Sequence, residues 1–103
     1  MNPRHEGKPL LRLLDGYVMD AIGHLDPAEA SALTAMEPQL RRDWGGAGDW
    51  RALCAAQMRF PDGMAGAIRE VWEKGRAKFL ASEGYEPSAE QFTRSFVDSK
   101  FPR

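Results

Sequence analysis

The stretch PLLRLLDGYVMDAIGHLDPAE, residues 9–29, decides the fold of this chain. Its apolar residues recur at steps of three and four, a spacing that places them along one side of a helix. Pro9 suits the first position of this helix, because the backbone N–H that proline lacks would make no hydrogen bond within the helix there. Gly23 suits its end because glycine adopts the left-handed conformation freely. The predicted buried stripe consists of Leu10, Leu11, Leu14, Tyr17, Val18, Ala21, Ile22 and Leu25.

The same stretch ends in the start signal of a second helix. The carboxylate of Asp26 can accept hydrogen bonds from free N–H groups of the first turn, and Pro27 fixes the backbone there. Further on, Pro38 interrupts the apolar pattern, and a proline in a helix interior costs about 3 kcal/mol through a lost hydrogen bond and a steric clash. The sequence therefore predicts a helix from Pro27 that breaks before Pro38, and a short helix from Pro38 to Trp44.

The remaining helix starts are each preceded by a residue whose side-chain oxygen can cap the first turn. A flexible glycine-rich loop at residues 45–48 comes before them. Gly84 predicts the end of the fourth helix and places Tyr85 against Leu80. The caps and first helical residues are Asp49 before Trp50, Asp62 before Gly63, and Ser88 before Ala89, with Gln91 completing a capping box at the last.

The fold class follows from these signals and from the lack of any segment that alternates with the period of two of a strand. We expect an all-α fold, a compact orthogonal or bundle-like array of four to five short helices. Residues 9–100 form the single helical domain expected at this length. Residues 1–8 are polar and aperiodic and are expected to be a flexible N-terminal tail, while residues 101–103 are expected to be a frayed C-terminus.

The composition is that of an ordinary globular chain, with 43% apolar and 28% charged residues among 103. With a formal net charge of −1, the protein has no strong overall electrostatic attraction to nucleic acid or to an acidic membrane. No apolar run approaches the roughly 20 residues of a membrane span, and a single cysteine cannot form an internal disulfide. We expect a cytoplasmic protein without a membrane partner.

The chain offers no set of residues for catalysis, for a metal or for a cofactor. His5 and His24 are too far apart for the i, i+4 spacing of a helix-borne zinc site. Cys54 falls among apolar residues on the inner side of its helix, where burial raises a thiol pKa and suppresses reactivity. No phosphate-binding loop or dinucleotide fingerprint is present. We therefore expect no catalytic residue, no metal ligand and no cofactor, and a protein that is not an enzyme.

Residues 49–80 suggest a helix-turn-helix, because a short helix, a tight turn and a longer basic helix follow one another there. The helical wheel argues against a face that reads DNA. Arg69 and Lys74 lie on opposite sides of the apolar stripe. Glu70 and Glu73 lie on the outer face between them, where they would meet the phosphates. Nucleic-acid binding is therefore the disfavoured alternative.

A second alternative is a small-ligand site in the interior of the helical array. Trp44, Trp50 and Trp72 would line it, since aromatic side chains form the walls of many ligand pockets. Trp44 also continues the apolar stripe of its helix, which is typical of a core residue. A large interior cavity would favour this alternative.

The face of the first helix opposite its apolar stripe is the predicted partner surface. Arg12, Gly16 and Met19 lie on it, with Asp20 beside them. A glycine inside a helix costs about 1 kcal/mol relative to alanine and often permits close approach of another backbone. Methionine suits an adaptable protein contact. Unless another helix of the same chain covers this face, we expect it to bind another protein or a second copy, as in small regulators, adaptors and immunity-type proteins.

Overall fold

The computed structural model describes residues 3–101, which form an all-α array of five helices preceded by a short 3-10 helix. These residues contain no strand, and the predicted fold class is confirmed. The elements in chain order are η1 (Pro3–His5), α1 (Pro9–Ala21), α2 (Pro27–Trp44), α3 (Trp50–Met58), α4 (Met64–Glu83) and α5 (Ala89–Lys100).

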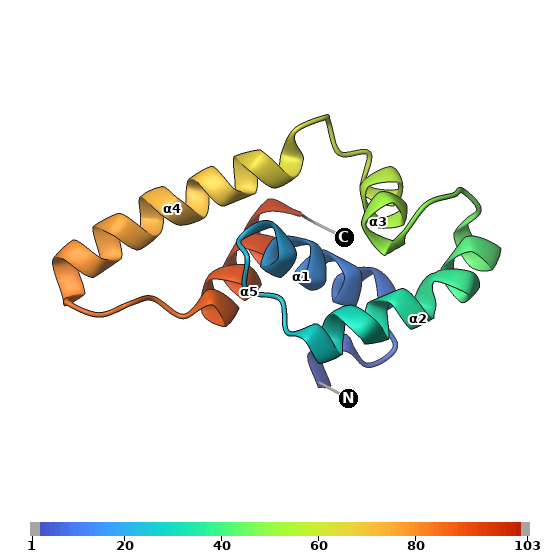
Figure 1. Cartoon of the computed structure of the whole chain (residues 1–103), viewed down its shortest axis with the longest axis horizontal. Helices are drawn as coiled ribbons and strands as arrows, with labels where there is room; N and C mark the ends of the chain where they lie inside the picture. Colours follow the sequence, from blue (N-terminus) through green and yellow to red (C-terminus); the bar gives the residue numbers. More distant parts are fainter. Residues whose placement is uncertain (1–2, 102–103) are drawn as a thin grey trace.

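Helix α1 is the centre of the array (Figure 1). It packs against η1 and against each of the other four helices, whereas α2 and α3 also pack against each other. Its residues Leu13, Leu14 and Val18 are completely buried. Leu13 lies outside the predicted stripe and is buried because neighbours cover α1 on more than one side. A one-sided amphipathic pattern therefore underestimates the buried surface of this helix.

The predicted helix starts are confirmed at three of four caps. Asp62 is the exception, because the cap position of α4 is taken by Gly63, with φ of 84° and no side-chain hydrogen bond. In the other three, the side-chain oxygen accepts from a backbone N–H: Asp26 from Ala28 at 2.8 Å, Asp49 from Ala52 at 3.0 Å, and Ser88 from Gln91 at 3.2 Å.

The predicted helix ends at glycine are also confirmed. Gly23 follows α1 with φ of 80°. Its N–H donates to the Asp20 carbonyl at 3.1 Å, and the N–H of His24 donates to the Met19 carbonyl at 2.9 Å. These are the paired hydrogen bonds of a Schellman motif. Gly84 ends α4 in the same left-handed conformation.

Two helix ends carry features that the sequence does not predict. After α4, the ring of Tyr85 contacts the ring of Phe79 at a centroid distance of 5.2 Å, whereas the sequence predicts a contact with Leu80. After α3, Arg59 adopts a left-handed conformation with φ of 56°, as no other non-glycine residue of the described chain does. An L-residue is strained there because its Cβ approaches the following carbonyl oxygen.

The predicted break at Pro38 is wrong, because α2 continues through this residue from Pro27 to Trp44. Leu33 and Leu40 lie on either side of Pro38 and are both buried. Full burial of one leucine contributes about 1.5–3 kcal/mol, so two together offset the cost of about 3 kcal/mol for an interior proline. The packing of α2 on α1 and α3 thus outweighs the local signal.

Both ends of the domain lie against the core rather than apart from it. In the segment expected to be a flexible tail, Arg4 and His5 contact side chains of α1, and Arg4 also reaches α5. Phe101, expected to fray, is buried against the rings of Phe60 and Phe96 at centroid distances of 5.0 and 5.5 Å. The outermost positions of both predicted ends, 1–2 and 102–103, lie outside the described residues.

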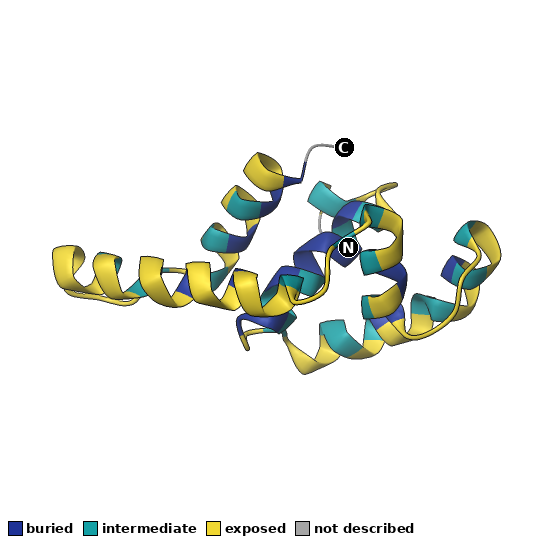
Figure 2. Ribbon diagram, turned by 90° about the horizontal axis from the view of Figure 1, so that it is seen from above, coloured by how far each residue is buried: buried dark blue, intermediate teal, exposed yellow. Residues whose placement is uncertain are grey.

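Helix α4 projects from the array and makes the molecule elongated (Figures 1 and 2). The extents are 46 × 30 × 24 Å, and the radius of gyration of 14.2 Å exceeds the value of about 13 Å typical of a domain of this length. The half of α4 nearer α1 holds its two buried residues, Ile68 and Trp72. Residues 73–83 contribute none, and they reach beyond the other helices before the chain returns to α5.

Candidate functional site

The four residues of the predicted partner surface do not share one exposed face. The outward placement of Gly16 is wrong, because Gly16 is buried beneath α2 and α3. A Cβ added there would lie 2.5 Å from Cδ1 of Leu33 and 3.5 Å from the ring of Trp50. The glycine therefore permits close helix packing within the chain, the alternative in which another helix covers this face.

The other three residues lie on two sides of α1. Arg12 and Met19 are partly buried and line, together with Gly16, a pocket of about 540 Å³. Asp20 lies outside this pocket, where its carboxylate accepts from Arg51 of α3 at 2.7 Å. The structure thus brings three of the four residues to one pocket, and their contact with a partner remains a prediction.

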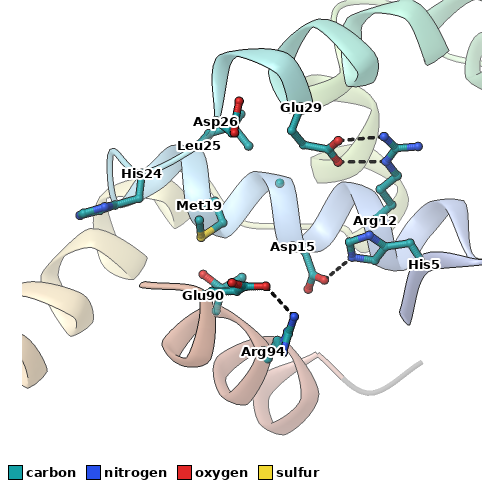
Figure 3. Close-up of a pocket in the computed structure, with 12 residues that line it drawn as sticks. His5, Arg12, Asp15, Met19, His24, Leu25, Asp26, Glu29, Glu90 and Arg94 are labelled. Atoms are coloured by element: carbon teal, nitrogen blue, oxygen red, sulfur yellow. Dashed lines mark hydrogen bonds and ion pairs between the residues drawn. The ribbon is translucent and has the colours of Figure 1, made fainter. Parts of the chain in front are cut away.

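The pocket lies between α1, the start of α2 and the start of α5 (Figure 3). Met19 and Leu25 contribute partly buried apolar surface. Charged side chains from all three helices, together with His5 of η1, surround them, and several are joined in ion pairs. The volume lies within the range of about 300–1,000 Å³ that is usual for small-molecule sites.

The deepest charged group of the pocket is Asp15, which is only 8% exposed. Its carboxylate accepts two hydrogen bonds from Arg4 at 2.8 and 3.0 Å and lies 2.5 Å from Nε2 of His5. Arg4 also donates to Asp98 of α5 at 2.9 and 3.1 Å. These hydrogen bonds, the one to Asp15 foremost, raise the pKa of Arg4. A buried carboxylate needs such partners because its isolated charge is costly to desolvate.

A second ion pair joins α1 to α2 on the pocket wall. Arg12 donates to both carboxylate oxygens of Glu29, at 2.9 and 2.8 Å, in the bidentate geometry that favours arginine. The hydrogen bond from Arg12 lowers the pKa of Glu29, although partial burial opposes this shift. Within α5, Arg94 donates to Glu90 at 2.5 Å.

Two polar groups of the pocket are left without such partners. The Asp26 carboxylate accepts from the N–H of Ala28 and has no cationic partner among the described residues. Thr93 is 2% exposed, and its hydroxyl makes no hydrogen bond within that part of the chain. A buried hydroxyl without a partner is uncommon, since most buried polar groups are satisfied.

A separate exposed surface, which we call the α4 arm, comprises residues 71–85. It carries the large hydrophobic residues of the described chain that are most exposed: Val71 at 48%, Leu80 at 40% and Tyr85 at 62%. Between the arm and the start of α5 runs a shallow groove whose walls include Trp72, Phe79 and Phe92. Figure 2 shows the outer turns of α4 as almost wholly exposed.

The three tryptophans do not come together in one ligand site. Trp50 is completely buried beside Gly16, in contact with the centre of the array. Trp72 lies on α4 and lines the groove of the α4 arm, whereas Trp44 lies at the end of α2 and lines a different hollow beside Leu11. The interior cavity that would favour the second alternative therefore does not form between them.

The helix-turn-helix alternative also lacks support in the geometry of residues 49–80. Helix α3 packs on both α1 and α2, whereas α4 packs on α1. The basic side chains of α4 are engaged by the chain itself: Arg69 donates to the Ala21 carbonyl at 2.9 Å, Lys74 pairs with Glu70 at 2.9 Å, and Arg76 pairs with Glu86 at 2.7 Å.

Cys54 lies in the core, as predicted, with no exposed surface. Burial raises its pKa to about 12, so the thiol stays protonated at neutral pH. The described part of the chain holds no group of three or more His, Cys, Asp or Glu side chains placed to bind a metal ion. None of the helices within residues 3–101 is both long and apolar enough to cross a membrane.

Comparisons of the chain with protein-family models, with curated proteins and with solved structures give no match.

The sequence does not predict the ion-pair network around Asp15. Arg4 and His5 lie in a segment without periodicity, and the contact of Arg4 with Asp98 spans 94 positions. Asp15 is the one residue whose position hints at an ion pair. It directly follows buried Leu14, and a charged side chain that is buried needs a partner. The identity of that partner does not follow from local sequence.

Proposed function

We propose that this chain is a non-enzymatic module that binds another protein through the α4 arm. The observation that carries the proposal is that the three most exposed large hydrophobic residues of the described chain, Val71, Leu80 and Tyr85, all lie on the α4 arm. Single exposed hydrophobic residues are ordinary on a protein surface, but several of them beside a groove with aromatic walls, as in this arm, are typical of an interaction site.

The lack of tertiary packing on the arm supports the proposal that a partner protein binds there. Most of the stability of a helix in a protein comes from tertiary packing of one of its faces. No residue within 73–83 is buried, so this part of α4 packs little against the rest of the described chain. A partner seated against the groove would bury Phe79 and Phe92 as well, and aromatic residues are enriched at the centres of protein interfaces.

We favour the arm over the α1 face as the contact surface, because Gly16 is buried and the other three residues lie on two sides of α1. The partner is a different protein or a second copy of this chain. We place its action in the cytoplasm, because the free thiol of Cys54 suits a reducing compartment.

The test is capture of the partner from the native cell with a photo-crosslinking residue at position 80 of the arm. The matched control carries the same residue at Ala56, an exposed position of α3. We expect a discrete crosslinked species at position 80 and not at position 56, and its loss in a Val71→Asp variant. Equal crosslinking at both positions, or none at position 80, would refute the proposal.

A further inference from the structure

We draw no further inference here: the strongest candidate, the shallow groove between the α4 arm and the start of α5, belongs to the surface already proposed as the partner contact, and nothing in the structure shows what covers it.

Discussion

The segment before α1 is predicted to hold the fold together, and Arg4→Ala tests this. Among the described residues, Arg4 alone donates a hydrogen bond to Oδ1 of Asp15, whereas Oδ2 also contacts His5 and would keep that contact without Arg4. The side chains of Arg4 and Asp15 are 18% and 11% exposed, so this is close to a buried ion pair. Removing one partner of a buried pair costs about 3–5 kcal/mol because the other charge is left without compensation.

The retained contact with His5 reduces this figure, because only one oxygen of Asp15 is left unpaired. We therefore expect Arg4→Ala to lower the free energy of unfolding by about 2–3 kcal/mol. The lost contact with Asp98 adds little, since that side chain is 51% exposed. For a domain of this length, the change corresponds to a fall in Tm of about 8–24 °C.

The assay is denaturant unfolding followed by tryptophan fluorescence, with linear extrapolation to water. Lys8→Ala is the control, because it removes an exposed cation from the same segment and is expected to change stability by less than about 0.5 kcal/mol. In a double-mutant cycle, Arg4→Ala and Asp15→Asn should couple by about 1–2 kcal/mol. If Arg4→Ala unfolds within about 0.5 kcal/mol of the unmodified chain, the reasoning about Asp15 fails.

Three further predictions follow from other parts of the fold. Trp72→Ala should lose about 3–5 kcal/mol of the free energy of unfolding, because Trp72 anchors α4; a thermal melt near that of the unmodified chain would contradict this. The pKa of Glu29 is lowered in the folded protein, so its ion pair with Arg12 contributes its full stabilisation at pH values above 4.5, the ordinary pKa of a glutamate. This contribution is lost as the pH falls through the lowered pKa. Glu29→Gln should therefore reduce stability at neutral pH but show a smaller further loss in acid, as measured by unfolding across pH. Arg59→Gly should raise the free energy of unfolding by about 0.5–1 kcal/mol, because glycine removes the strain of the left-handed conformation; a lower stability in denaturant unfolding would contradict this.

The sequence predicts the helix boundaries well because their causes are local. Asp26 caps the N–H of Ala28 two residues away, and Gly23 closes a motif that spans six residues. Such contacts are present in any short segment that adopts the same backbone, so they can be predicted without knowing the rest of the fold. The failure at Pro38 has the opposite cause, since the burial of Leu33 and Leu40 depends on α1 and α3.

The candidate site was predicted less well because its contacts join distant parts of the chain. The helical wheel assigns Gly16 to an open face on the assumption that α1 has one buried side. A helix at the centre of an array has several, and the missing side chain of Gly16 admits Leu33 from α2. Charged residues on such a helix therefore acquire partners from neighbouring elements, as Asp15 does from Arg4.

The pocket and the α4 arm rest on different elements of the fold but are in contact. The pocket is built on the starts of α2 and α5, whereas the arm begins where α4 leaves α1. His24 is the point where they meet: it lines the pocket, and its ring contacts the edge of Trp72 at a centroid distance of 5.5 Å. Val71 directly precedes Trp72, and Asp26 lies two positions after His24, so both lie close to this contact. A substitution at either position can therefore affect the pocket and the arm together.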